Sequence, residues 1–127
     1  MTKFSISKRI ESFGYAGKGI KSFLFREHNA WIHSVVTVLV VIAGCLFHIT
    51  RNEWIAILLC VALVFAAEAF NTAIERLVNI VSPERNVQAG DVKDIAAGAV
   101  LICAIIAAIV GLIIFTPYIL VELAFES

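Results

Sequence analysis

Two glutamates, Glu68 and Glu75, lie at the inner end of a long apolar run, and their spacing places them on one side of a helix. Asn71 and Thr72 fall on the same side, because residues i, i+3, i+4 and i+7 of a helix share a face. An ionised carboxylate in hydrocarbon costs several kcal/mol, so it needs a compensating partner or a function. This polar stripe is therefore expected to face something other than lipid.

Further polar groups gather at the same end of the predicted bundle. Glu27 ends the N-terminal segment, and Lys93 and Asp94 begin the last apolar segment. Carboxylate and amide oxygens suit a hard cation such as Mg²⁺ that bridges phosphate oxygens, and Lys93 would be a point charge for those phosphates. Glu68 lies deeper than Glu75, and a desolvated carboxylate there would accept a proton from a hydroxyl. A second interpretation stays open, in which these side chains only bridge neighbouring helices.

The composition predicts an all-α membrane protein. Of the 127 residues, 61% are hydrophobic and only 16% are charged. The mean hydropathy of +0.94 is too high for a soluble domain of this size. Nucleic acid is not an expected partner, because the sequence has no cluster of Arg and Lys with interleaved aromatic residues. The three cysteines lie in apolar runs without the spacing of metal ligands.

The apolar pattern divides the chain into four helical segments. Residues 4–28 repeat apolar side chains at steps of three and four, which predicts an amphipathic helix on the membrane surface, with a break expected around Gly14 to Gly19. A polar loop over residues 84–92 precedes the last segment. Three segments are long and apolar enough to span a bilayer, namely 31–49, 54–81 and 94–118.

The basic residues are distributed unevenly between the two sides of the membrane. Nine of the ten lie in the N-terminal segment or around the loop before the last span, and Arg51 alone lies on the other side. The positive-inside rule therefore places the N-terminus in the cytoplasm and the C-terminus outside. At about 1.5 Å per residue, Glu68 lies about 21 Å and Glu75 about 31 Å from Trp54, against roughly 30 Å of hydrocarbon. Both acids are thus expected near the cytoplasmic surface.

The string from Glu68 to Glu75, together with Lys93-Asp94 and the small residues that follow, resembles the signature of the prokaryotic diacylglycerol kinase family, which includes undecaprenol kinases. The resemblance extends over nearly the whole chain, so residues 1–127 are expected to form one domain. It implies an enzyme of the bacterial cytoplasmic (inner) membrane that transfers the γ-phosphoryl group of ATP to the hydroxyl of diacylglycerol or undecaprenol. It also implies Mg²⁺ as cofactor and a homotrimer with active sites shared between subunits.

The same resemblance implies roles for individual residues. Glu68 would be the catalytic base that meets the lipid substrate, and Asn71 would position the reacting groups. Glu27 and Glu75 would hold the metal and so contact ATP, while Lys8 would lie near the lipid head and the phosphates. The remaining expected nucleotide contacts are Tyr15, Glu84, Arg85, Asn86, Lys93 and Asp94.

Two positions depart from the family pattern. An aliphatic residue usually stands at the position of Phe70, and an aspartate at the position of Asn79, so one charge near the site is missing here. A different class of protein is also conceivable: a non-catalytic assembly subunit, or a small transporter that carries protons or ions on its buried acids. That alternative gives no reason for Lys93-Asp94 and the basic N-terminal segment to meet on one side. Between the two lipids, the residues around Ser82-Pro83 and after Asp94 favour undecaprenol or a broad lipid specificity, while the family resemblance keeps diacylglycerol as a candidate.

Overall fold

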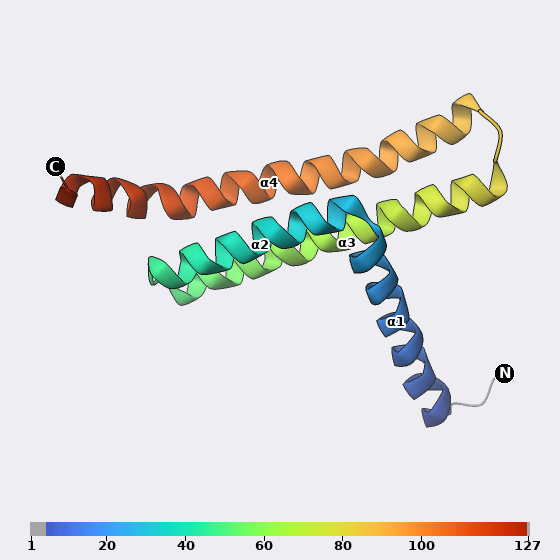
Figure 1. Cartoon of the computed structure of the whole chain (residues 1–127), viewed down its shortest axis with the longest axis horizontal. Coiled ribbons are helices and arrows are strands. Elements are labelled where there is room, and N and C mark those ends of the chain that lie inside the picture. The colour runs from blue at the N-terminus through green and yellow to red at the C-terminus, as the bar shows by residue number, and fades with distance from the viewer. Residues whose placement is uncertain (1–4, 127) are drawn as a thin grey trace.

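The computed structural model describes residues 5–126, and over this range it contains four α-helices. Figure 1 shows a long antiparallel hairpin of α3 (Arg51–Val81) and α4 (Val87–Glu126), with α2 (His28–Leu46) beside α3 and α1 (Ile6–Arg26) projecting from the bundle. Three helices, α2, α3 and α4, are long and apolar enough to cross a membrane, as predicted, although α2 ends at Leu46 and not at residue 49. The ends of the predicted 1–127 domain, residues 1–4 and 127, lie outside the described residues.

The first helix is continuous. The expected break around Gly14 to Gly19 does not occur, because each glycine in a helix costs only about 1 kcal/mol and no other part of the chain approaches these positions within 4 Å. Almost every residue of α1 is exposed, and Phe23 in its last turn is its buried residue. An amphipathic helix on the membrane surface therefore stays a prediction.

The connection between α3 and α4 is shorter than predicted. It comprises residues 82–86, because Asn86 caps α4 and lets the helix begin before Asp94. The Asn86 Oδ1 atom accepts hydrogen bonds from the backbone N–H groups of Gln88 at 2.8 Å and Ala89 at 3.3 Å. At its other end α4 continues past the predicted boundary at residue 118, with Pro117 inside the helix.

A capping box begins α3 at the end of the bundle that holds the α2–α3 turn. The Thr50 hydroxyl accepts a hydrogen bond from the Glu53 backbone N–H, and the Glu53 carboxylate accepts one from the Thr50 N–H at 2.7 Å, so α3 begins at Arg51. Tyr118 of α4 donates its hydroxyl hydrogen to the same carboxylate at 2.8 Å. Ile49, Ile57 and Ile114 form a buried apolar cluster at this end, which joins the α2–α3 turn to α4.

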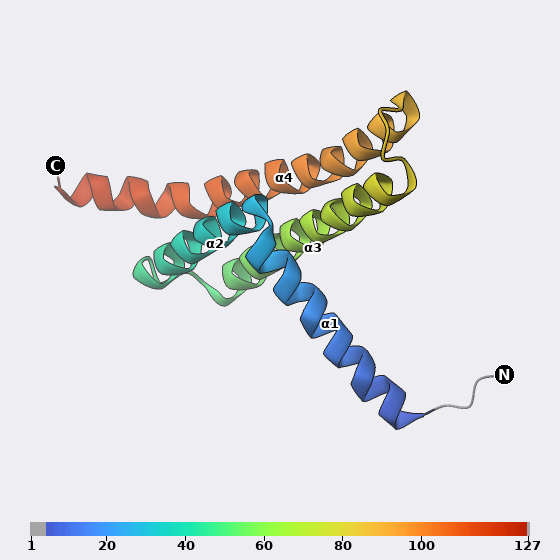
Figure 2. The same ribbon diagram turned by 45° about the vertical axis from the view of Figure 1, so that its right-hand side comes forward.

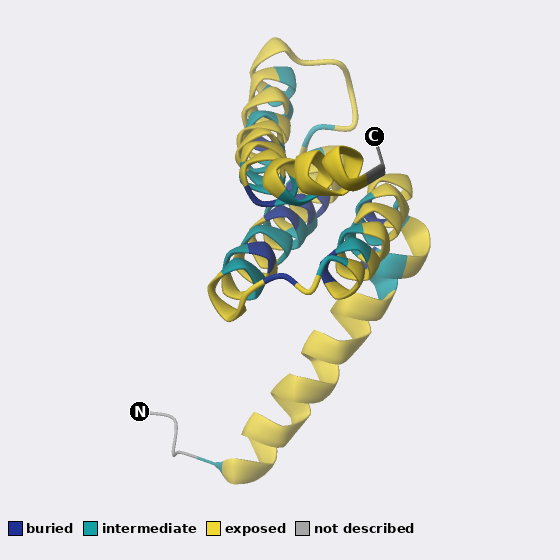
Figure 3. Cartoon of the chain, turned by 90° about the vertical axis from the view of Figure 1, so that its left-hand side faces the viewer, coloured by how far each residue is buried: buried dark blue, intermediate teal, exposed yellow. Residues whose placement is uncertain are grey.

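At the opposite end of the bundle, α3 extends beyond the shorter helix α2. The helix α3 has 31 residues and α2 has 19, so roughly three turns of α3 extend beyond the start of α2. The Phe65 ring makes edge contacts with Phe23 of α1 and His33 of α2, at centroid distances of 6.4 and 6.3 Å. Phe65 thus marks the level of the α1–α2 junction, and Glu68 follows one turn later. Figure 3 shows the buried residues concentrated between the helices of the bundle, with most outward surfaces exposed.

Among the glycines, Gly44 is the one at which an added Cβ atom would meet a neighbouring part of the chain. A Cβ atom there would lie 2.7 Å from Cη2 and 2.8 Å from Cζ2 of Trp54. We expect Gly44→Ala to lower the free energy of unfolding by about 1–3 kcal/mol through overpacking, measured by SDS titration in mixed micelles. Gly111→Ala is the matched control, because its Cβ would meet nothing within 4 Å of this chain. Equal stability of the two variants would contradict this description of the α2–α3 contact.

Candidate active site

The centre of the candidate site is a buried polar group on α3. Glu68, Asn71 and Thr72 are 2%, 6% and 6% exposed, and they are the buried polar side chains of the described part of the chain. They belong to the stripe that the helical period predicted. Among the remaining residues of this helix, Phe70 and Leu77 are largely exposed, so the polar side of α3 faces protein and the apolar sides face outward.

Asn71 links the buried part of the stripe to its exposed end. Its Nδ2 group donates a hydrogen bond to Oε1 of Glu75 at 3.4 Å. Its Oδ1 atom is buried and has no hydrogen-bond partner. A buried acceptor without a donor costs about 1–3 kcal/mol, so this oxygen is suited to a group supplied by a ligand. Glu75 itself is exposed, and the stripe therefore leads from the interior to the surface.

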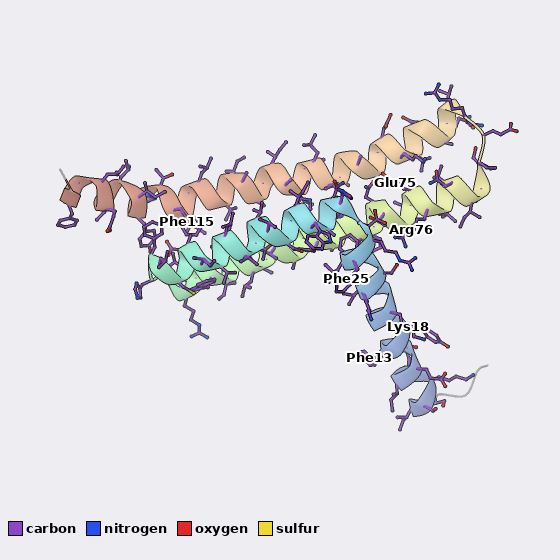
Figure 4. All side chains as sticks on the ribbon, viewed as in Figure 1. Phe13, Lys18, Phe25, Glu75, Arg76 and Phe115 are labelled. Atoms are coloured by element: carbon purple, nitrogen blue, oxygen red, sulfur yellow. The ribbon has the colours of Figure 1, made fainter. Side chains whose placement is uncertain are left out.

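Glu27 is brought to this end of α3 by Arg76, a residue that the sequence analysis did not assign to the site. Glu27 has an extended backbone between α1 and α2. Arg76 Nη2 donates to Glu27 Oε1 at 2.5 Å, and Nη1 donates to Ser22 Oγ of α1 at 3.3 Å. Figure 4 shows Glu75 and Arg76 on α3 where α1 leaves the bundle. The one signal in the sequence was a basic residue directly after Glu75, and its partner 49 residues away could not be read from spacing.

Lys93 is held across the α3–α4 hairpin. Its Nζ group donates a hydrogen bond to Oδ1 of Asn79 at 2.6 Å. The departure from aspartate to Asn79 therefore keeps a hydrogen-bond partner for Lys93 and removes the negative charge. Asp94, the next residue of α4, is exposed. Helix α4 thus adds one cation and one carboxylate at the same end of the bundle as Glu75.

The other predicted nucleotide and lipid contacts are not gathered around Glu68 by this single chain. Lys8 and Tyr15 lie along α1, which projects away from the bundle in both Figure 1 and Figure 2, and Lys8 is roughly 27 Å along the helix from Arg26. The ammonium group of Lys18 lies 5.7 Å from the centre of the Tyr15 ring. The loop residues Glu84, Arg85 and Asn86 are exposed, and Asn86 has the capping role described above.

The carboxylates fit a metal that arrives with phosphate groups better than a metal site preformed in the protein. Within residues 5–126, no group of three His, Cys, Asp or Glu side chains could hold a metal ion. Glu27 is paired with Arg76, and Glu75 accepts from Asn71. Mg²⁺ is commonly bound by one or two carboxylates, with water and substrate phosphates completing its octahedron. The two carboxylates of Glu27 and Glu75 therefore fit Mg²⁺ that is bound jointly with a nucleotide.

Comparison with known proteins decides the family. Residues 14–115 match the family described as prokaryotic diacylglycerol kinase. The chain belongs to this family. Its members act as kinases on lipids and use ATP as co-substrate, so this membrane protein is a lipid kinase, and a non-catalytic subunit or a transporter is not favoured.

Individual relatives cover most of this kinase. The undecaprenol kinase of Bacillus subtilis is 37% identical over 112 residues, which is 88% of this chain and 91% of that protein. The diacylglycerol kinase of Escherichia coli is 30% identical over 100 residues, 79% of this chain and 82% of that protein. The diacylglycerol kinase of Synechocystis sp. is 36% identical over 107 residues, 84% of this chain but 61% of that longer protein.

The neutral partner of Lys93 leads to a prediction about ATP binding. In Asn79→Asp a carboxylate would form an ion pair with Lys93 and compete with phosphate for its charge. Because exposed ion pairs contribute about 0.2–1 kcal/mol, we expect the KM for ATP to rise by about two- to fivefold in steady-state kinase assays. Asn79→Ala, which removes the hydrogen bond without adding charge, is the control. If both variants had the same KM, a role for the missing charge would be ruled out.

Proposed function

We propose that this kinase phosphorylates undecaprenol at the cytoplasmic surface of a bacterial inner membrane, in a homotrimer whose active sites are shared between subunits. The choice of lipid is supported by the undecaprenol kinase that is 37% identical over nearly its full length. Diacylglycerol is the second candidate, supported by the relatives from Synechocystis sp. and Escherichia coli, which are diacylglycerol kinases. Mg²⁺ is the proposed cofactor, and the N-terminus lies in the cytoplasm with the C-terminus outside.

The burial of Glu68 is the observation that carries the proposed mechanism. Glu68 is 2% exposed, and the helix that carries it is apolar for several turns before this residue. A lipid alcohol reaches such a position from the membrane, and a carboxylate without a cationic partner is a suitable proton acceptor. In the proposed step the lipid oxygen forms a bond to the γ-phosphorus, and its proton passes to Glu68. The bond from the γ-phosphorus to the bridging oxygen breaks, and ADP leaves.

The groups around Glu68 provide positioning and charge. Asn71 is proposed to position the reacting groups, and its unpaired Oδ1 atom is free to accept a hydrogen bond from a bound substrate. Glu27 and Glu75 would hold Mg²⁺, which when bound neutralises charge on the transferring phosphoryl group. Lys93 adds a second positive charge at the phosphates. Such a site needs no phosphate-binding loop, because phosphoryl transfer depends mainly on positioning and electrostatic stabilisation.

The position of α1 supports a site built from more than one subunit. Lys8 and Tyr15 lie far along a helix that leaves its own bundle, so they are proposed to serve the lipid head and the nucleotide of a neighbouring site. The exposed set proposed to contact the nucleotide from the α3–α4 end consists of Glu84, Arg85, Asn86 and Asp94. The exposed apolar sides of the spanning helices leave ample surface for lipid and for neighbouring subunits.

Replacing the proposed base tests the mechanism. Glu68→Gln keeps the shape of the buried side chain but cannot accept a proton, so we expect kcat to fall by about 10²–10⁴-fold with assembly unchanged. The measurement is transfer of ³²P from γ-labelled ATP to lipid, with size-exclusion chromatography as the check on assembly. Glu122→Gln, an exposed position near the far end of α4, is the control and should retain full activity. Near-normal turnover of Glu68→Gln would exclude Glu68 as the base.

Competition between lipids tests the substrate. Purified kinase in mixed micelles is given undecaprenol and diacylglycerol at equal mole fraction with labelled ATP. We expect the label to appear predominantly in undecaprenyl phosphate, because the relative that is 37% identical is an undecaprenol kinase. Predominant label in phosphatidic acid would replace the proposed substrate by diacylglycerol and leave the mechanism intact.

A further inference from the structure

Arg76 has no role in the proposed mechanism, although it makes two interactions at the edge of the site. It donates from Nη2 to Glu27 at 2.5 Å and from Nη1 to Ser22 at 3.3 Å. These bonds join α3 to the last turns of α1 and to the single residue between α1 and α2. Arg76 also follows Glu75 directly, so it lies next to one proposed metal ligand in sequence and contacts the other in space.

This placement creates a conflict of charge at Glu27. A divalent cation is attracted by the negative charge of a carboxylate, and a guanidinium in contact with that carboxylate offsets this charge and repels the incoming ion. The Oε1 atom of Glu27 is occupied by Arg76. Glu27 therefore binds a metal ion more weakly while its ion pair with Arg76 persists.

The surroundings allow the pair to open. The Arg76 side chain is 47% exposed and that of Glu27 is 28% exposed, so both groups can be solvated when they separate. The second partner of Arg76 is the neutral Ser22 hydroxyl. Exposed ion pairs are weak and exchange readily, in contrast to buried ones, where separation leaves an uncompensated charge.

We propose that Arg76 is a positioning residue that holds Glu27 in the nucleotide-free kinase and must release it when the divalent cation binds. The proposal rests on the assignment of Glu27 as a metal ligand under the proposed function. The metal ion replaces the Arg76 guanidinium at the Glu27 carboxylate, and the ion pair between Arg76 of α3 and Glu27 is lost in the same event. A purely structural ion pair would fasten α1 to α3 without competing with metal.

Binding of Mn²⁺ together with a nucleotide separates these two roles. Full-length kinase in detergent micelles is titrated with the Mn²⁺ complex of a non-hydrolysable ATP analogue, and the unbound complex in an ultrafiltrate is measured by electron paramagnetic resonance. Because the competing pair is exposed, we expect Arg76→Gln to bind Mn²⁺ about two- to fivefold more tightly than the wild type. Arg76→Lys keeps the charge and should stay close to the wild type. Arg51→Gln removes one positive charge from the far end of the same helix and is the control for net charge.

A double variant shows whether the effect passes through Glu27. Glu27→Gln should weaken Mn²⁺ binding, and adding Arg76→Gln to it should produce no further gain. Unchanged or weaker binding by Arg76→Gln, or no detectable binding by either it or the wild type, would overturn the proposal. Unchanged binding by Glu27→Gln would instead reject the metal assignment of the proposed function.

If Arg76→Gln failed to fold, Ser22→Ala would replace it. Loss of the Arg76 hydrogen bond should then tighten Mn²⁺ binding to a smaller extent, and unchanged binding would overturn the proposal.

Discussion

The cost of placing a carboxylate within a membrane-spanning helix governs the arrangement of this protein. Glu68 is nearly inaccessible, and its neighbours Asn71 and Thr72 are buried with it on the same side of α3. Lipid cannot compensate these groups, so the polar side of α3 has to be covered by protein. The apolar sides of the same helix are left outward, where membrane or another subunit covers them. A long central helix with one polar side therefore requires partners along that side.

Because α3 is longer than α2, the polar side of α3 reaches an exposed end of the bundle, where the candidate active site lies. Helix α2 begins near the level of Phe65, so α3 extends beyond it. This part of α3 carries the polar stripe from the interior to an exposed end. At that end Glu27 is contributed by the connection between α1 and α2, and Lys93 and Asp94 are contributed by α4. In the proposed mechanism, a lipid hydroxyl approaches from the buried side and a nucleotide from the exposed side. The family relationship makes the protein a lipid kinase, and this gradient of exposure explains how the two substrates could meet in the proposed mechanism.

Periodicity was sufficient to predict the polar stripe and the three spans, because both depend on local sequence and on the length of apolar runs. The helix ends were less predictable. Asn86 looks like a loop residue, and only its hydrogen bonds to Gln88 and Ala89 show that it begins a helix. The contacts between distant residues were least predictable, as the pairs Arg76–Glu27 and Lys93–Asn79 show. They depend on where α1 crosses α3 and on how the hairpin aligns, which no spacing within one helix encodes.

The central claim is that the exposed end of the stripe faces the nucleotide in the cytoplasm, and side-specific labelling tests it most directly. Single cysteines at Arg85 and at Glu122 are introduced into a variant without the native thiols and exposed to a membrane-impermeant maleimide on intact spheroplasts. The account predicts that the cysteine at residue 122 is labelled at once and that the cysteine at residue 85 is labelled only after permeabilisation. Labelling of residue 85 on intact spheroplasts would place the candidate site outside the cell and contradict the account.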